Sequence, residues 1–244
     1  MLHLVIALKN LRQAKSRLAA VLNQAQREML VVAMARDLVD LCIAHPKVAE
    51  VTLVTGAHWD RYLRDESGLN IRRETTETTQ DLNAALDTAL DGVSDQAVLI
   101  VHGDLPLLSR PDIDELATQL AGADLIICPD DNERGTNGLA FRPGHRPPLM
   151  FGSDSYAGHR RSAAQRGCHW RFLKTPGFSF DVDTPADLQR LAGLSFAGAS
   201  VGRHLQAWLE TESVNLSVTQ VAASSGPFDG VSVSAEALGQ VSRR

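Results

Sequence analysis

Three aspartates stand at the ends of apolar segments, where their carboxylates could bind a metal ion. Asp104 follows the apolar run Val98–Val101, and Asp181 and Asp183 alternate with apolar residues in Phe178–Asp183. Strand alternation would put Asp181 and Asp183 on one face, where two like charges repel by about 4 kcal/mol at ~4 Å and an effective dielectric near ~20. We therefore expect a cation between them, and oxygen ligands favour Mg²⁺ over zinc. Asp183 alternatively belongs to a helix start.

Basic residues gather in two segments of the chain. Residues 1–27 carry a charge of +5 and no acid, from Lys9, Arg12, Lys15, Arg17 and Arg27. Residues 134–180 carry +7, and the rest of the chain carries −17, so the net charge of −5 hides two basic segments in an acidic body. Clustered cations usually mark an anion site, although the second segment is also consistent with a solvated surface.

Two loops carry glycines and small polar side chains. The segments Arg134–Gly138 and Phe151–Ser155 offer hydroxyls and backbone amides suited to phosphate or carboxylate oxygens, although ordinary turns use the same residues. The run His159-Arg160-Arg161 adds positive charge on a predicted helix. A lone His or Trp is more often packed than catalytic, so we interpret three further residues as structural: His45, Trp59 and His102.

Short apolar runs alternate with segments of helical spacing along most of the chain. The predicted strands are Leu2–Leu8, Val51–Thr55, Ala97–Val101, Leu125–Cys128, Asn137–Arg142 and Phe178–Val182. The predicted helices are Gln26–Ala44, Asp81–Leu90, Tyr156–Arg166 and one that starts at Thr184-Pro185. Strands that are apolar throughout are buried on both faces, which predicts an α/β fold, a three-layer αβα sandwich with a mostly parallel central sheet.

The ends of these strands are where the site should form. Open α/β sheets bind ligands at the carboxyl ends of their strands, and the basic segment Lys9–Leu18 directly follows the first strand. The core domain is predicted to span residues 1–192. Residues 193–244 are predicted to be an extension, partly helical or disordered, in which Val201–Leu209 is amphipathic and could be a docking helix.

Composition limits the class of protein and its compartment. A net charge of −5 argues against a nucleic-acid or membrane-surface partner, and no apolar run approaches the ~18 residues that span a bilayer. The N-terminus is apolar from its first residue, unlike a secretory signal. An odd number of cysteines, without C-x-x-C spacing, predicts buried thiols and a cytoplasmic protein: Cys42, Cys128 and Cys168.

Taken in order, the motifs resemble the guanylyltransferases of deazaflavin coenzyme F-420 biosynthesis. The matching segments are Lys9–Leu18, Asp81–Leu86, Gly103–Leu108, Gly135–Asn137, Phe151–His159 and Asp181–Leu188. The resemblance covers about residues 2–192 and implies the nucleotide-diphospho-sugar transferase (Rossmann-like) fold. Family members commonly carry Gly-Thr-Gly-Thr-Asn where this chain has Arg134-Gly135-Thr136-Asn137.

The resemblance also implies roles for individual residues. Those implied to bind the nucleotide are Lys9, Lys15, Arg17 and Asn83, with Lys15 and Asp104 as the catalytic pair. The implied Mg²⁺ ligands are Asp104, Asp181 and Asp183. The implied ligands of the acid substrate are Thr136, Gly152 and Ser155.

The implied reaction joins GTP to phosphoenolpyruvate, 2-phospho-L-lactate or 3-phospho-D-glycerate and releases pyrophosphate. A phosphate oxygen of the acid attacks the α-phosphorus of GTP, so positioning and charge neutralisation suffice and no protein nucleophile is needed. The product would pass to a transferase that builds the coenzyme's side chain. The sequence leaves open which acid is the substrate and whether the protein is a homodimer. Two other functions also remain open: another nucleotidylyltransferase or glycosyltransferase activity of the same fold, and a non-catalytic nucleotide-binding module.

Overall fold

A seven-stranded sheet forms the centre of the computed structural model, which describes residues 1–8, 10–11, 14–59, 61–62, 69–73, 82–93, 95–196 and 201–212. The strands are β1 (Leu2–Ala7), β2 (Val48–Thr55), β3 (Leu69–Arg73), β4 (Ala97–His102), β5 (Leu125–Pro129), β6 (Thr136–Phe141) and β7 (Trp170–Phe172). Their order is β3-β2-β1-β4-β6-β5-β7. Only β6 runs antiparallel to its neighbours, so the predicted mostly parallel sheet is confirmed.

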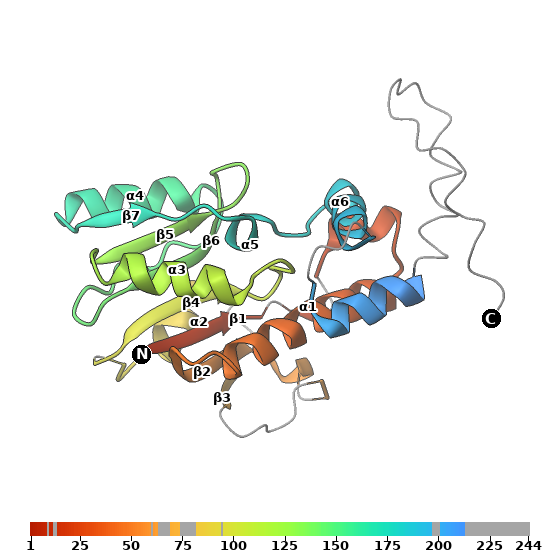
Figure 1. The fold of residues 1–244 in the computed structure, drawn as a ribbon, viewed down its shortest axis with the longest axis horizontal. Helices are drawn as coiled ribbons and strands as arrows, with labels where there is room; N and C mark the ends of the chain where they lie inside the picture. The colour runs from red at the N-terminus through yellow and green to blue at the C-terminus, as the bar shows by residue number, and fades with distance from the viewer. Residues whose placement is uncertain are drawn as a thin grey trace. The chain divides into compact units, whose positions relative to one another are not determined.

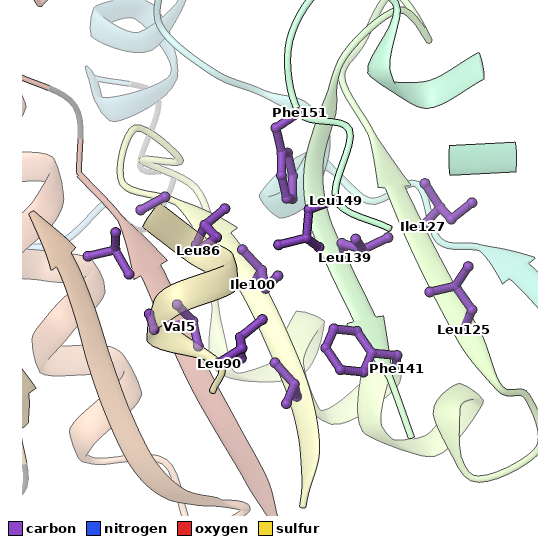
Figure 2. Close-up of a cluster of buried hydrophobic side chains, with 14 of the residues drawn as sticks. Val5, Leu86, Leu90, Ile100, Leu125, Ile127, Leu139, Phe141, Leu149 and Phe151 are labelled. Carbon is purple, nitrogen blue, oxygen red and sulfur yellow. The ribbon is translucent and has the colours of Figure 1, made fainter. Parts of the chain in front are cut away.

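Helices cover both faces of the sheet, which makes the predicted three layers (Figure 1). The helices are α1 (Gln24–Ile43), α2 (Leu82–Ala89), α3 (Arg110–Leu120), α4 (Ser155–Gln165), α5 (Pro176–Ser179) and α6 (Pro185–Phe196), with 3-10 turns η2 (Ser16–Ala20) and η3 (Ala57–Trp59). On one face α2 and α4 pack over apolar side chains of β1, β4, β5 and β6 (Figure 2). The other face is covered by α1 and α3 (Figure 1). No helix within the described residues is long and apolar enough to cross a bilayer.

One predicted strand, Phe178–Val182, is wrong. The chain instead forms the short helix α5, because Thr175 caps it by accepting a hydrogen bond from the Phe178 amide and Pro176 occupies its first position. Residues 180–183 follow without regular structure, yet Phe180 and Val182 stay buried. The predicted alternation of burial therefore survives without a strand.

Helix α3 and strands β3 and β7 are absent from the sequence-based prediction. The sequence does carry a signal for α3, because Ser109 is followed three residues later by Asp112, as at the start of many helices. In the structure the amide and the hydroxyl of Ser109 donate to the carboxylate of Asp112. Apolar residues at Ile113, Leu116 and Leu120 then face the core. By contrast, β7 has only three residues, too few for a periodic pattern.

A further helix over residues 203–212 belongs, up to Thr211, to the compact unit Met1–Thr211. Its apolar side chains Leu205, Trp208 and Leu209 are buried within this chain, so the face that would make it a docking helix is already covered. The predicted division at residue 192 stays a prediction. The predicted disorder after residue 212 lies outside the described residues.

Two of the three residues predicted to be structural are packed in the core, whereas His102, at the end of β4, is partly exposed. Trp59 and His45 are buried, and all three cysteines are free. Cys42 and Cys128 are buried as predicted, whereas Cys168 is partly exposed.

Candidate active site

The ends of three central strands meet at one edge of the sheet. In the parallel pair β1 and β4, Ala7 lies opposite His102. Because β6 runs antiparallel to β4, with Gly138 opposite Val101, its first residues lie at the same edge as the last residues of β4. Ligands of open α/β sheets bind at this edge, so the segments after β1 and β4 and the start of β6 are the candidate site.

A close backbone approach positions Asp104 just beyond β4. The amide of Gly103 donates to the Ala7 carbonyl at 3.1 Å, and a Cβ at Gly103 would lie 2.3 Å from the Leu8 side chain. Only glycine fits there without displacing Leu8. The next residue, Asp104, is thereby held against the end of β1 and is 7% exposed.

Lys15 brings a buried cation to Asp104. It precedes η2 with a φ of 54°, in the left-handed region that is uncommon for a residue other than glycine. Its Nζ donates to Asp104 Oδ2 at 2.6 Å and to Asp183 Oδ1 at 2.7 Å. Burial alone would lower the pKa of Lys15, but the two carboxylates outweigh burial and raise that pKa, so the ammonium stays charged.

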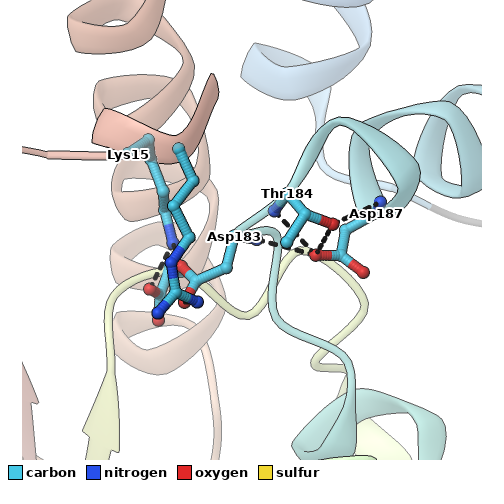
Figure 3. A network of polar contacts seen from close by, with 6 residues as sticks. Lys15, Asp183, Thr184 and Asp187 are labelled. Atoms are coloured by element: carbon cyan, nitrogen blue, oxygen red, sulfur yellow. Dashed lines mark hydrogen bonds and ion pairs between the residues drawn. The ribbon is translucent and has the colours of Figure 1, made fainter. Parts of the chain in front are cut away.

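A helix cap fixes Asp183 opposite Lys15. One carboxylate oxygen of Asp187 accepts hydrogen bonds from the Asp183 amide at 3.1 Å and from the Thr184 amide and hydroxyl, each at 2.7 Å (Figure 3). This is the predicted Thr184-Pro185 helix start, which opens α6. Because the cap uses Asp187, the carboxylate of Asp183 is left to face Lys15.

Asp181 completes a cluster of three carboxylates. Oxygens of Asp104, Asp181 and Asp183 lie within 4.8 Å of one another. Burial, followed by the charges of Asp104 and Asp183, raises the pKa of Asp181 to about 6, although Lys15 opposes the shift. Three clustered carboxylates with one ammonium carry surplus negative charge, and such oxygen donors suit a hard divalent cation. The residues therefore fit a divalent-metal site.

The other predicted phosphate ligands divide into described and undescribed residues. Arg17 is largely exposed, with its guanidinium 3.9 Å from Asp183 Oδ2, so it can swing toward a polyanion. Lys9 and Arg12 lie outside the described residues.

The first residues of β6 tie the carboxylate cluster to the second polar loop. Asn137 donates to the carbonyls of Phe178 at 3.0 Å and Ser179 at 3.4 Å, which anchors the segment that leads to Asp181. Thr136, its neighbour, is buried, and its hydroxyl lies 3.0 Å from the ring of His159. The Gly135–Asn137 motif therefore supports both sides of the site.

Asn83 is held by the backbone of Phe151. Its amide nitrogen donates to the Phe151 carbonyl at 3.0 Å, and its oxygen accepts from the Phe151 amide at 2.7 Å. This pair positions Gly152, which has a φ of 142°, and Ser155 at the start of α4. Binding of the nucleotide by Asn83 stays a prediction, because these two bonds use its carbonyl oxygen and one of its amide hydrogens.

His159 was predicted to add positive charge, and that prediction is wrong. Its side chain is fully buried, and burial, with a contribution from His102, lowers its pKa to about 4. Helical spacing carried a signal that the prediction missed, since Tyr156, His159 and Ala163 are three and four residues apart on the buried side of α4. The neighbouring Arg160 stacks on the ring of Tyr156.

A sheet edge that carries a buried lysine among three carboxylates is suited to the phosphates of a nucleotide bound together with a divalent cation. Residues 2–220 match the family described as guanylyl transferase, CofC-like. The chain belongs to this family, and it is a guanylyltransferase by that membership.

Curated relatives carry three different substrate names. A phosphoenolpyruvate guanylyltransferase of Chloroflexus aggregans is 33% identical, over 78% of this chain and 95% of its own length. A 3-phospho-D-glycerate guanylyltransferase of Phenylobacterium zucineum is 32% identical, over 77% and 88%. A 2-phospho-L-lactate guanylyltransferase of Methanothermobacter thermautotrophicus is 32% identical, over 75% and 81%.

Solved structures share the fold at low sequence identity. A protein of Desulfovibrio desulfuricans G20 assigned to the nucleotide-diphospho-sugar transferases superposes with a TM-score of 0.71 at 16% identity, over 89% of this chain and 97% of its own. Rv0371c of Mycobacterium tuberculosis, solved in complex with manganese, gives 0.51 at 17%, over 78% and 96%. The nucleotide-diphospho-sugar transferase fold implied by the sequence motifs is confirmed.

Proposed function

We propose that this guanylyltransferase joins GTP to a small phosphorylated acid as a step of coenzyme F-420 biosynthesis. The candidate acids are phosphoenolpyruvate, 2-phospho-L-lactate and 3-phospho-D-glycerate, the acids in the names of its relatives. A phosphate oxygen of the acid forms a bond to the α-phosphorus of GTP, and the bond to the β-phosphate breaks to release pyrophosphate. The observation that carries the proposal is the buried Lys15 bound to two of three clustered carboxylates.

In this reaction the protein's residues need only position the two substrates and neutralise the charge of their phosphates. A phosphate monoester is already an anion at neutral pH, so the acid attacks without a protein base. Holding two reactants in line replaces a bimolecular encounter, and fixed charges stabilise the charge that develops on the leaving group. The absence of a Ser/His/Asp or Cys/His arrangement from the sequence motifs is consistent with this route.

On the nucleotide side, the carboxylates and the basic residues have separate roles. Asp104, Asp181 and Asp183 would hold Mg²⁺, which when bound neutralises charge on phosphate oxygens. Lys15, whose ammonium is bound to Asp104 and Asp183 in this structure, would bind the departing pyrophosphate. Lys9 and Arg17 bind the remaining oxygens of the triphosphate.

On the acid side, small groups at the start of β6 and α4 bind the substrate's oxygens. The hydroxyls of Thr136 and Ser155 are both nearly buried, and Gly152 leaves its backbone open to a ligand. The first turn of α4 adds the favourable field of a helix N-terminus for an anion. Of the basic residues in 134–180, Arg134 lies beside the start of α4, with its Nε 3.5 Å from Asp154, whereas Arg142 and Arg146 pair with Asp124 and Asp87.

The wider setting follows from the same proposal. The phosphoanhydride product is handed to the transferase that attaches the coenzyme's side chain. The cytoplasmic location expected from the cysteines stays a prediction, and the oligomeric state is open.

Pyrophosphate release from GTP, measured separately with each of the three acids, tests the proposal. Wild type should release pyrophosphate with at least one acid, and neither CTP nor UTP should outcompete GTP. Asp104→Ala should lower kcat/KM about 100-fold or more, because it removes a ligand of the cation that neutralises the triphosphate. The matched control is Asp87→Ala, which removes an exposed carboxylate paired with Arg146. Unchanged turnover in Asp104→Ala would refute the metal role, and no release with any acid would refute the function.

A further inference from the structure

His159 connects the two segments assigned to the acid substrate. Its ring lies between the start of β6 and the loop before α4, with Nδ1 3.0 Å from Thr136 Oγ1 and Nε2 3.1 Å from the Met150 amide nitrogen. The ring is fully buried and packs edge-on against Phe151, with centroids 5.1 Å apart. His159 therefore has a fixed orientation and two fixed partners.

The partners decide which ring nitrogen carries the proton. A backbone amide can only donate, so Nε2 must accept from Met150 with its lone pair. Burial keeps the ring neutral by lowering its pKa to about 4. A neutral imidazole has one N–H, and here that N–H is on Nδ1. Nδ1–H therefore donates to the hydroxyl oxygen of Thr136.

This donation orients the hydroxyl of Thr136. Its oxygen accepts from His159, and its own hydrogen remains available. Within the described residues that hydrogen has no acceptor on the chain. A nearly buried hydroxyl with an unused hydrogen needs an acceptor from outside the chain, either a water or an oxygen of a bound ligand.

We propose that His159 is a positioning residue that makes the Thr136 hydroxyl a hydrogen-bond donor to an anionic oxygen of the acid substrate. The inference rests on the proposed function, since it refines how the acid is bound. His159 acts through Thr136 and does not touch the reacting atoms. Its second bond, to Met150, ties the same ring to the loop that carries Gly152, so one side chain aligns both parts of the acid site.

Two substitutions separate the two bonds of the ring. In His159→Asn the side-chain amide can occupy the position of Nδ1 and still donate to Thr136, but it loses the acceptor for Met150. In His159→Gln the amide oxygen can reach the position of Nε2 and accept from Met150, but the donor to Thr136 is lost. Both variants introduce a neutral amide, so they form a matched pair.

Steady-state kinetics with the acid that wild type uses should distinguish them. His159→Gln should raise KM for the acid about tenfold, as expected for losing an oriented bond to an anion, with KM for GTP unchanged. His159→Asn should recover most of that loss. In a Thr136→Val background, His159→Gln should add little, because the two residues act as one unit. The inference would be overturned if the effects of Thr136→Val and His159→Gln on KM for the acid were additive, or if His159→Asn and His159→Gln raised that KM equally. A change confined to KM for GTP would also overturn it.

Nitrogen NMR of imidazole-labelled wild type gives a readout that needs no turnover. The ring of His159 should show the Nδ1–H tautomer at neutral pH, and Thr136→Val should shift the Nδ1 resonance. A proton on Nε2 would overturn the inference even in an active enzyme, which leaves the proposed function intact. If wild type is inactive but the proton lies on Nδ1, the proposed function is refuted. The inferred direction of the hydrogen bond from His159 to Thr136 is then unaffected.

Discussion

Lys15 and the three carboxylates behave as a single charged unit. With Asp104 and Asp183 bound to its ammonium at 2.6 and 2.7 Å, Lys15 neutralises charges that would otherwise repel one another in a partly buried site. Among the described residues Asp181 forms no ion pair of its own, and burial, followed by the charges of Asp104 and Asp183, raises its pKa. The unit is therefore poised to accept further positive charge, which a metal bound with the nucleotide would supply.

The pKa of Asp181 predicts how the response to metal depends on pH. Its ordinary value is 3.8, and in the folded protein it is about 6, so the folded state binds this proton more tightly than the unfolded state. Without metal, Asp181 therefore lowers stability progressively as pH rises from about 4 to about 6, and the full penalty remains above that window. A divalent cation relieves the penalty but must displace the proton to do so.

Adding Mg²⁺ should therefore raise Tm more at about pH 7.5 than at about pH 5. Thermal unfolding of the full chain, with and without Mg²⁺ at each pH, measures this difference. In Asp181→Asn the rise in Tm caused by Mg²⁺ should differ less between the two pH values, because the titrating carboxylate has been removed. Equal Mg²⁺ shifts at both pH values in wild type would contradict the assignment.

At the scale of elements, capping residues decide where segments begin and which carboxylates stay free. Asp187 caps the start of α6, so the carboxylate of Asp183 is not used by the cap and accepts a hydrogen bond from Lys15. Asp37 of α1 likewise accepts from the amides of His204 and Leu205, at 2.9 and 2.8 Å, and so starts the helix over residues 203–212. The fit is close, since a Cβ on Gly202 would lie 2.0 Å from Asp37 Cγ.

Asp37→Ala should lower the free energy of unfolding by about 0.5–2 kcal/mol, the usual cost of losing an N-terminal cap. Asp40→Ala is the matched control on the same helix. It removes only the partly exposed ion pairs with Arg203 and His204, which are worth about 0–1 kcal/mol. Urea denaturation of both variants measures the difference. A loss in Asp40→Ala equal to or larger than that in Asp37→Ala would contradict the capping role.

The sequence predicted elements best where apolar periodicity was long. The first strand and the long helix α1 differ from their predicted ranges by one or two residues. The strand at Phe178–Val182 failed because local capping by Thr175 and hydrogen bonds from Asn137 replaced a strand partner. Such tertiary bonds leave no trace in periodicity.

At the scale of the molecule, strand order gathers residues that lie far apart in the chain. Lys15 and Asp104 meet because β1 and β4 are neighbours, and Asp183 joins them from the segment that Asn137 of β6 anchors. Asp104 at the end of a strand and the basic segment after the first strand could be read from sequence, because open α/β sheets place such ends together. The direction of β6 could not, since it depends on which strands pair. The burial of His159 had a signal in the helical spacing of the buried residues of α4, which the prediction missed.

The central claim is that this site transfers a guanylyl group to a phosphorylated acid. Mass spectrometry of the products formed from GTP, Mg²⁺ and an equimolar mixture of the three acids tests the claim most directly. We predict a product whose mass is that of one acid plus a guanylyl group, formed together with pyrophosphate and absent when the acids are omitted. Hydrolysis of GTP with no such adduct, or an adduct formed only when CTP or UTP replaces GTP, would contradict it.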